Sequence, residues 1–181
     1  MPFSIEKAPI DGLIIIEPKK FYDFRGFFEE TYKKSDFTTF GIKENFVQDN
    51  HSCSKKGVVR GIHFQRAPFA QGKLIRVLKG KVWDVAVDLR KKSPTFAKWF
   101  GVELSEENSK MFYIPPGFGH GFSVLEDDTH LFYKCTNEYN CECDGGIRWN
   151  DPDISVDWKL DATAIISEKD DKLPLLKEVS L

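Results

Sequence analysis

The stretch QGKLIRVLKGKVWDVAVDL, residues 71–89, predicts the fold class of the chain. Within residues 82–89 one phase is wholly apolar, whereas the other phase holds two aspartates. Alternation of this kind is typical of a β-strand. Residues 73–78 form a second candidate strand, and Lys79-Gly80 between the two predicts a hairpin turn that would pair them.

Short segments of the same kind recur along the chain. Runs rich in Val, Ile, Phe, Tyr and Trp lie between clusters of Gly, Pro, Asn and Asp, as in proteins made of many short strands. Further strands are expected over residues 13–17, 26–32, 58–64, 99–104, 111–114, 121–125, 131–136 and 154–158. Ser35 is expected to cap a short helix that ends at Gly41, and Ser167 to cap a second one with acidic residues in its first turn. Roughly ten strands and two short helices predict an all-β protein, a double-stranded β-helix or jelly roll.

Length and charge exclude several classes of function. A chain of 181 residues is expected to form one domain, residues 1–181. Its 26 Lys and Arg and 28 Asp and Glu are interspersed, whereas a nucleic-acid-binding protein normally has a basic stripe, so we expect no nucleic-acid partner. The longest aliphatic run, residues 13–16, is far shorter than the ~20 residues of a membrane helix. No secretory signal pattern is visible either. We therefore expect a cytoplasmic protein with no membrane association.

Four cysteines raise the question of zinc or a disulfide. Cys135, Cys141 and Cys143 lie within nine residues of one another, with His130 nearby, and Cys53 is distant in sequence. Structural zinc usually shows paired C-x2-C or H-x3-H elements, which this spacing lacks. We expect thiols rather than a zinc site. A disulfide from Cys135 to either neighbouring cysteine stays open.

Two polar side chains interrupt the apolar strand VVRGIHFQ, residues 58–65. Arg60 and His63 fall on opposite phases of this strand. Gly61 between them predicts a bulge that re-aims a side chain, a feature common beside active sites. The alternative is an edge strand with a solvated arginine and a hydrogen-bonded histidine.

Three more polar side chains have similar settings. Lys73 shares a phase with two aliphatic residues, which would place its ammonium at the rim of an apolar cavity; a snorkelling lysine is the alternative. In IPPGFGHGF, residues 114–122, prolines and glycines form a stiff turn that places His120 at the start of a strand. His120 is either a functional residue or part of a structural turn in which it forms a hydrogen bond with the backbone. In THLFYKCT, residues 129–136, Tyr133 lies on an apolar phase and is either a core residue or a functional one.

A jelly-roll barrel would bring these side chains together, because its inward strand faces share one cavity. Metal-binding cupins, which have this fold, typically offer an H-x-H pair, a carboxylate and a later histidine. Here the pair is reduced to His63 followed by Gln65, and Lys73 lies near the carboxylate position, where a cation would repel a metal ion. Only His120 stays in place. We expect no metal and no cofactor.

Without a metal or a nucleophilic Ser or Cys, the set fits proton abstraction beside a carbonyl. A histidine titrates near 6.5, and a ketone α-proton lies roughly a dozen units higher, a mismatch of about 16 kcal/mol. Fixed positive charge and donors in a dry site must therefore stabilise the enolate oxygen. Lys73, Arg60 and His120 are candidates for that role, and Tyr133 is a candidate general acid.

Several long strings of the chain resemble the dTDP-4-dehydrorhamnose 3,5-epimerase family. The matching strings are DFRGFFEETY, FVQDNHS, VVRGIHFQ, AQGKLIRVLKGKVWDVAVDLRKKSPTF, IPPGFGHGF, YKCTNEY, IRWNDPDISVDW and SEKD, in order over nearly the whole length. The resemblance implies a metal-free cupin isomerase that epimerises dTDP-4-dehydro-6-deoxy-D-glucose at carbons 3 and 5. Both carbons flank the same ketone, so one base and one enolate-stabilising set would serve both steps.

The resemblance also implies roles for individual residues. His63 would be the base, paired with Asp170, and Tyr133 would return a proton to the opposite face. Lys73, Arg60 and His120 would hold the oxyanion and sugar hydroxyls. The remaining substrate-binding residues implied are Arg25, Glu30, Gln48, Asn50, Lys169, Tyr139 as the aromatic that stacks on thymine, and Asp144 at a position that Glu often holds in the family.

The family resemblance further implies a homodimer with swapped N-terminal strands, in which Arg25 would serve the neighbour's site. Other functions stay open. A relative that epimerises carbon 3 alone is the nearest alternative. A metal-dependent cupin and a non-catalytic protein that binds sugar nucleotides are the alternatives from other classes.

Overall fold

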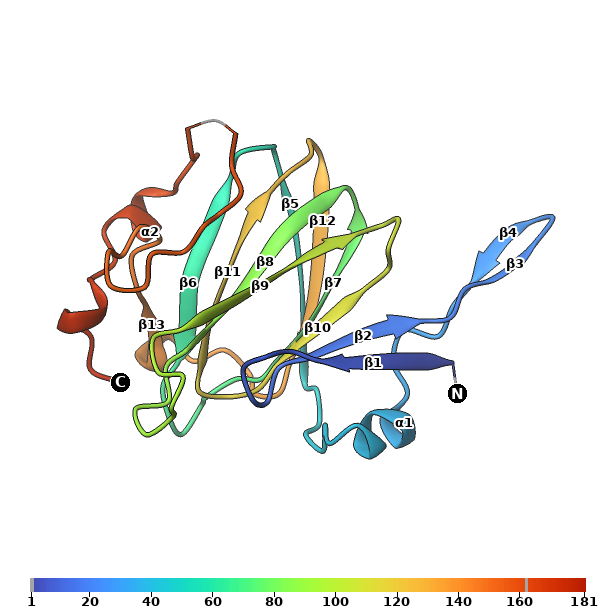
Figure 1. The fold of residues 1–181 in the computed structure, drawn as a ribbon, viewed down its shortest axis with the longest axis horizontal. Helices are drawn as coiled ribbons and strands as arrows, with labels where there is room; N and C mark the ends of the chain where they lie inside the picture. The colour runs from blue at the N-terminus through green and yellow to red at the C-terminus, as the bar shows by residue number, and fades with distance from the viewer. Residues whose placement is uncertain (1, 162) are drawn as a thin grey trace.

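Two antiparallel β-sheets packed face to face form the body of the protein (Figure 1). The structure is a computed structural model that describes residues 2–161 and 163–181. In spatial order, the six-stranded sheet contains β1 (Phe3–Lys7), β2 (Ile14–Pro18), β10 (Met111–Ile114), β7 (Lys73–Lys79), β12 (Thr129–Cys135) and β5 (Gln48–Ser54). The five-stranded sheet contains β13 (Asp144–Gly146), β6 (Val59–Gln65), β11 (Phe118–Val124), β8 (Lys81–Asp88) and β9 (Trp99–Ser105). This architecture confirms the prediction of an all-β jelly roll.

Short elements lie outside the two sheets. A hairpin of β3 (Phe21–Asp23) and β4 (Gly26–Phe28) projects away from the body (Figure 1). The described helices are α1 (Lys34–Thr39) and α2 (Glu168–Asp171), with 3-10 turns at Cys141–Cys143 and Leu176–Glu178. No helix among the described residues combines the length and the hydropathy that crossing a membrane requires.

Three apolar clusters hold these elements together. The first lies between the sheets and includes Ile75, Phe112 and Phe122. The second lies on the outer side of the five-stranded sheet, where C-terminal residues such as Trp158 cover it. The third lies on the outer side of the six-stranded sheet beneath α1, whose Phe37 is fully buried. Both sheets are therefore covered on two faces over part of their area, which explains why several strands read as nearly continuous apolar runs.

The predicted hairpin at Lys79-Gly80 is wrong. β7 and β8 follow each other in sequence but belong to different sheets, so Gly80 is a corner at which the chain crosses between them. Gly80 has φ +78, and a Cβ there would collide with Thr129, which explains the glycine. The apolar phase of β8 packs outward into the second cluster, whereas the phase with Asp84 faces the interior.

Other differences have local causes. Residues 154–158 do not form a strand, because the Asp151 carboxylate accepts bonds from the amides of Asp153 and Ile154 and turns the chain. β5 was not predicted, since its sequence QDNHSCS is entirely polar or small. Nor were β1, β3 and β13, of which β3 and β13 are three residues each.

The two predicted helices are present, but only one has the expected cap. α1 begins at Lys34 with Lys33 as N-cap and no side-chain cap bond, so Ser35 is not the cap. Gly41 follows α1 with φ +96, as expected of a glycine that ends a helix. Ser167 caps α2 by accepting a hydrogen bond from the Asp170 amide at 3.1 Å.

The predicted bulge at Gly61 is confirmed. In the pairing of β11 with β6, His120 lies opposite His63 and Phe122 lies opposite Arg60, so β6 has one extra residue between these pairs. The extra residue brings Arg60 and His63 to the same inner face, although the sequence places them on opposite phases. Gly61 has φ +121 and approaches the backbone of Gly121 closely.

The bulge makes a testable demand on Gly61. A Cβ at position 61 would lie 2.6 Å from Gly121 Cα and 2.8 Å from the His120 carbonyl oxygen, whereas a Cβ at Gly41 would meet nothing within 4 Å. Both glycines have positive φ, which costs a residue with a Cβ about 1–2 kcal/mol. Urea unfolding of Gly61→Ala should show that loss plus roughly 1–3 kcal/mol of overpacking. Gly41→Ala should show the first loss alone, and equal losses in the two variants would contradict this account.

Candidate active site

A hydrogen-bonded imidazole–carboxylate pair is the first feature of the site. His63 on β6 lies with its Nε2 2.8 Å from Oδ1 of Asp170 in α2. The second carboxylate oxygen, Oδ2, accepts a hydrogen bond from the Gly61 amide at 3.1 Å. The bulge at Gly61 and the cap at Ser167 therefore fix the carboxylate from two sides.

This carboxylate is charged at neutral pH. Burial opposes ionisation of Asp170, but the hydrogen bonds from His63 and Gly61 hold its pKa below the usual range. A charged partner fixes the tautomer of an imidazole and stabilises the imidazolium once a proton has been taken up. The pair is thus equipped for general base chemistry.

His120 forms a second, fully buried pair beside the first. It lies opposite His63 in the strand pairing, and its Nε2 is 2.9 Å from an oxygen of Asp84 on β8. Burial lowers the pKa of His120, and the charges of Lys73 and His63 act in the same direction against the opposing effect of Asp84. Lys73 and His63 are therefore both within electrostatic reach of His120.

Asp84 was not predicted as a site residue. Its signal in the sequence is an aspartate in the middle of a mostly apolar strand, where a charged residue is rarely left without a partner. In the structure Asp84 is completely buried and orients His120.

Lys73 and Tyr133 face the first two pairs from the other sheet. Lys73 on β7 has its Nζ 5.8 Å from the ring centre of Tyr133 on β12, and that ring lies 6.3 Å from the His120 ring. Lys73 is partly accessible to solvent, yet desolvation of its ammonium lowers its pKa. Burial raises the pKa of Tyr133, so its phenol stays protonated at neutral pH.

The edge strand β5 adds polar side chains to the same interior. The Gln48 side chain donates to Asn50 Oδ1 at 3.1 Å, and Asn50 in turn donates to the Cys135 sulfur at 3.5 Å. Arg60 crosses from the other sheet and donates to the Ser54 hydroxyl at 3.1 and 3.2 Å. Amide and guanidinium donors thus line one side of the site.

A third group lies at its rim. Lys169 Nζ is 2.7 Å from an oxygen of Asp144, and Tyr139 lies beside them with 54% of its surface exposed. A cavity of about 410 Å³ opens next to this group, lined in part by Arg60, His63, Lys169 and Asp170. An exposed aromatic ring and cations beside a cavity are suited to a nucleotide with a diphosphate.

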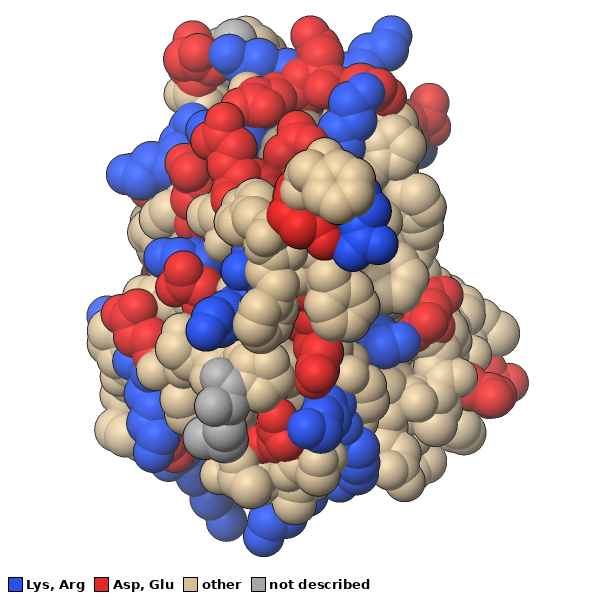
Figure 2. Space-filling model, turned by 90° about the vertical axis from the view of Figure 1, so that its right-hand side faces the viewer, with Lys and Arg blue, Asp and Glu red and all other residues tan. Residues whose placement is uncertain are grey.

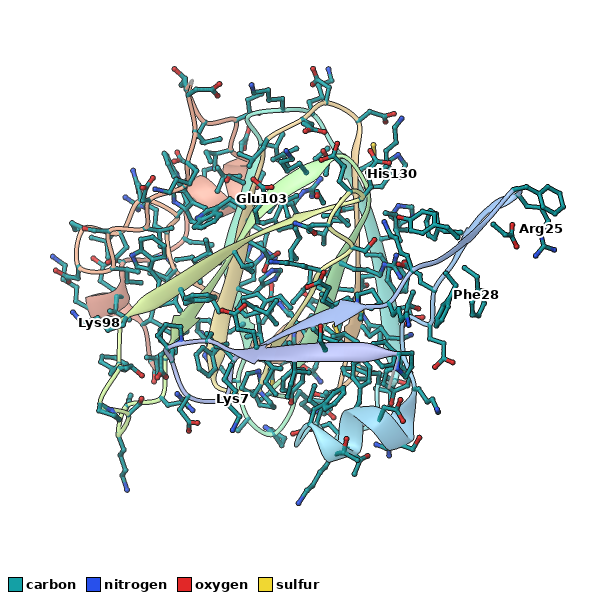
Figure 3. All side chains as sticks on the ribbon, turned by 45° about the vertical axis from the view of Figure 1, so that its right-hand side comes forward. Lys7, Arg25, Phe28, Lys98, Glu103 and His130 are labelled. Atoms are coloured by element: carbon teal, nitrogen blue, oxygen red, sulfur yellow. The ribbon has the colours of Figure 1, made fainter. Side chains whose placement is uncertain are left out.

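Two predicted residues, Arg25 and Glu30, form no hydrogen bond with the other predicted site residues within the part of the chain that the structure describes. Arg25 lies at the far tip of the β3–β4 hairpin, where it pairs with Asp23, and Phe28 lies nearer to the hairpin's base (Figure 3). Glu30 follows the hairpin and is partly buried, with one carboxylate oxygen that has no hydrogen-bond partner among the described residues. Figure 2 looks onto the face from which the hairpin projects and shows uncharged side chains among the charged ones.

The structure also shows the state of the cysteines and the contacts of Gln65. Cys135, Cys141 and Cys143 are free thiols, so the disulfide left open above is not formed. Gln65, at the position of the second cupin histidine, donates to the Asn140 carbonyl oxygen and accepts from the Asn140 amide. Its amide group is used to anchor a loop.

The chain is similar to known proteins over nearly its whole length. A family model described as dTDP-4-dehydrorhamnose 3,5-epimerase matches residues 7–178. An enzyme of that name from Methanothermobacter thermautotrophicus is 51% identical over 178 residues, covering 97% of this chain and 96% of the relative. Another from Salmonella typhimurium is 49% identical over 176 residues, with the same coverage of 97% and 96%.

Solved structures agree with the sequence matches. A dTDP-6-deoxy-D-glucose-3,5-epimerase from Legionella pneumophila, in complex with dTDP-4-keto-L-rhamnose, has a TM-score of 0.95 at 46% identity and covers 98% of this chain and 95% of its own. A 3'-monoepimerase from Streptomyces bikiniensis, in complex with dTDP-quinovose, has a TM-score of 0.89 at 30% identity, covering 95% and 87%. The matches extend over nearly the whole chain, which therefore belongs to the dTDP-4-dehydrorhamnose 3,5-epimerase family of isomerases.

Proposed function

We propose that this protein epimerises dTDP-4-dehydro-6-deoxy-D-glucose at carbons 3 and 5 to give dTDP-4-dehydro-L-rhamnose. The observation that carries the proposal is the placement of the His63–Asp170 pair on one sheet and of Lys73 and Tyr133 on the other, around one interior. The names of the relatives support the same reaction and substrate.

His63 is the base that removes the proton from carbon 3 and then from carbon 5. Asp170 holds the imidazole by its Nε2, which leaves the other ring nitrogen free to meet the substrate. The charged carboxylate fixes the tautomer of the ring and stabilises the imidazolium that forms once the proton has been taken up. Such a positioned base contributes typically about 10²–10⁴-fold to a rate.

Lys73 and His120 stabilise the enolate oxygen that forms at carbon 4. Without that stabilisation the imidazole cannot remove the proton. The difference in pKa between the ketone α-proton and the imidazole corresponds to about 16 kcal/mol, which exceeds what a base alone supplies. Lys73 provides a desolvated positive charge, and His120, oriented by Asp84, sits next to His63. The base and the oxyanion site therefore act on the two ends of the same ketone system.

Tyr133 returns the proton on the opposite face of the sugar. His63 belongs to the five-stranded sheet and Tyr133 to the six-stranded sheet, so a sugar ring between them meets the base on one side and the phenol on the other. Inversion requires that geometry. The raised pKa of Tyr133 keeps its proton available for transfer.

The nucleotide occupies the rim. Arg60 and Lys169 are the nearby cations for the diphosphate, Tyr139 offers an exposed ring to stack on thymine, and Gln48 and Asn50 offer amide donors. Asp144 already pairs with Lys169, so the substrate competes with this carboxylate for the ammonium. Glu30 and Arg25 complete the set proposed for the substrate.

Arg25 reaches a site only in a dimer. The β3–β4 hairpin exposes several aromatic residues, including Phe24 at 98% and Tyr22 at 73%, a large apolar surface for a protruding arm. We infer a homodimer in which this arm crosses to the partner and delivers Arg25 to the partner's cavity. The projection of the hairpin from the body supports this exchange (Figure 1).

Solvent exchange separates double from single epimerisation. Incubation of the substrate with the protein in deuterated water, read by proton NMR, should place deuterium at carbons 3 and 5, because both protons are acidified by one ketone. Label at carbon 3 alone would make the protein a single-site epimerase. Tight dTDP binding with no label at either carbon would make it a non-catalytic binding protein.

The base and the acid should give different losses. His63→Asn should abolish exchange at both carbons, since the amide cannot accept the proton. Tyr133→Phe should leave exchange largely intact and block inversion, because abstraction survives while return from the opposite face does not. Full inversion by Tyr133→Phe would remove the tyrosine from its role.

The alkaline limb of the pH profile should report Lys73. Desolvation lowers its pKa below the usual 10.5, so kcat/KM should fall as the pH rises through that lowered value and the ammonium loses its charge. Burial raises the pKa of Tyr133, which moves its ionisation in the opposite direction from that of Lys73. Lys73→Met should lose about 10²–10³-fold in kcat. Lys73→Arg should move the alkaline limb upward, because a guanidinium stays charged; an unmoved limb would assign it to another group.

Complementation tests whether Arg25 acts across the dimer. Arg25→Ala and His63→Asn should each be impaired as homodimers. A mixed dimer has one site with the native His63 of one chain and the native Arg25 of the other, so co-expression should restore activity. If Arg25 serves its own chain, no site in the mixed dimer is intact and activity stays at the level of Arg25→Ala.

A further inference from the structure

A cluster of potential metal ligands lies outside the catalytic cavity, at the end of strands β5 and β12. Cys53 and His130 are directly opposite each other in the pairing of these strands, and Asp128 lies in the loop that leads into β12. One ligand atom from each of the three side chains lies within 4.8 Å of the other two. Cys53 and Asp128 are exposed and His130 is partly exposed. His130 lies at the periphery of the molecule (Figure 3).

The separations between these atoms match a tetrahedral zinc site. Bond lengths of about 2.3 Å for sulfur and about 2.0–2.2 Å for nitrogen and oxygen place neighbouring ligand atoms of a tetrahedron about 3.3–3.7 Å apart. The Cys53 sulfur is 3.4 Å from Asp128 Oδ1, and His130 Nε2 is 3.5 Å from the same oxygen. Two edges of the tetrahedron are therefore already present.

Further contacts orient two of the three ligands. His130 Nδ1 is 2.9 Å from His51 Nε2, so the second nitrogen of the imidazole has a partner and Nε2 is left for a metal. Lys79 binds the other carboxylate oxygen of Asp128, Oδ2, and leaves Oδ1 directed at Cys53 and His130. Such outer contacts fix the tautomer and the direction of metal ligands. The Lys79 ammonium is the nearest opposing charge, and it occupies an atom that the metal does not need.

The backbone is irregular at Asp128 and at His130. Asp128 has φ +54, a left-handed conformation that is uncommon outside glycine and in which aspartate is among the more frequent of the other residues. The pairing of β12 with β7 shifts register between His130 and Leu131, and a bulge of this kind re-aims a side chain. Two local irregularities thus converge on one cluster.

We propose that Cys53, Asp128 and His130 bind a divalent cation of the zinc class, with an open fourth position for water or a further ligand. A thiolate, an imidazole and a carboxylate together suit zinc or cobalt, whereas magnesium and calcium prefer oxygen ligands alone. The cation ties the edge strand β5 to β12. Because Gln48 and Asn50 lie on the inner face of β5, the cation steadies the strand that lines the cavity from its opposite face.

Cobalt titration of the full-length protein tests the site. After removal of metal with a chelator, in a reductant without thiols, Co²⁺ should give a thiolate-to-cobalt absorption band that saturates at one equivalent per chain and disappears on addition of Zn²⁺. Cys53→Ser should lose the band, and His130→Gln should weaken binding at least tenfold. His51→Gln, which removes only the outer contact, should weaken binding about 10–100-fold.

Cys141→Ser is the matched control, because Cys141 is also an exposed free thiol but lies outside the cluster. This variant should bind Co²⁺ like the native protein. Zn²⁺ should also raise the Tm of the native protein by a few degrees and leave that of Cys53→Ser unchanged. Absence of the band, a band that persists in Cys53→Ser, or a band lost in Cys141→Ser would overturn the proposal.

Discussion

The desolvated ammonium of Lys73 is the constraint on which the rest of the site depends. Among the described residues it has no carboxylate within ion-pair distance, and its pKa is lowered because its charge lacks the compensation of water. Burying an unpaired cation in this way lowers the stability of the folded protein. The cost is offset when a negatively charged oxygen binds next to the cation. In the proposed reaction, the enolate supplies that oxygen. A site built on an unpaired lysine is thus complementary to the charge that develops during the reaction, and not to the neutral ketone that enters.

The two sheets are what make this arrangement possible. The proposed base His63 and its carboxylate come from β6 and α2, while Lys73 and the proposed acid Tyr133 come from β7 and β12. The carboxylate and the neighbouring histidine are held by contacts outside the reaction itself. Asp170 depends on the Ser167 cap and the Gly61 amide, and His120 depends on Asp84. Such supporting contacts fix a site more firmly than loops alone could.

Much of this could be predicted from the sequence, and the failures have physical causes. Alternation predicted the strands, and Gly61 predicted the bulge that brings Arg60 and His63 to one face. The pairing of His63 with Asp170 came only from family resemblance, because 107 positions separate them in the chain. The strand β5 was not predicted because its inward side chains are polar and line the cavity, whereas strand prediction relies on apolar side chains that pack in the core. The corner at Gly80 looks like a hairpin locally, and only the packing of two sheets distinguishes the two.

Asp84 and the Cys53 cluster were missed for related reasons. Asp84 on β8 is paired with His120, which lies on another strand, β11. The sequence pattern of β8 therefore does not show which residue is its partner. Cys53 and His130 face each other through strand pairing, at a separation for which no short spacing motif exists. Sequence patterns predict which side chains share a face of one element, whereas contacts between elements follow from the fold.

A crystal structure of the His63→Asn variant with dTDP-4-dehydro-6-deoxy-D-glucose bound would test the central claim most directly. We expect the ketone oxygen at carbon 4 within hydrogen-bond distance of Lys73 Nζ, with the ring between position 63 and Tyr133. A ketone oxygen directed away from Lys73, into water or toward another group, would contradict the account.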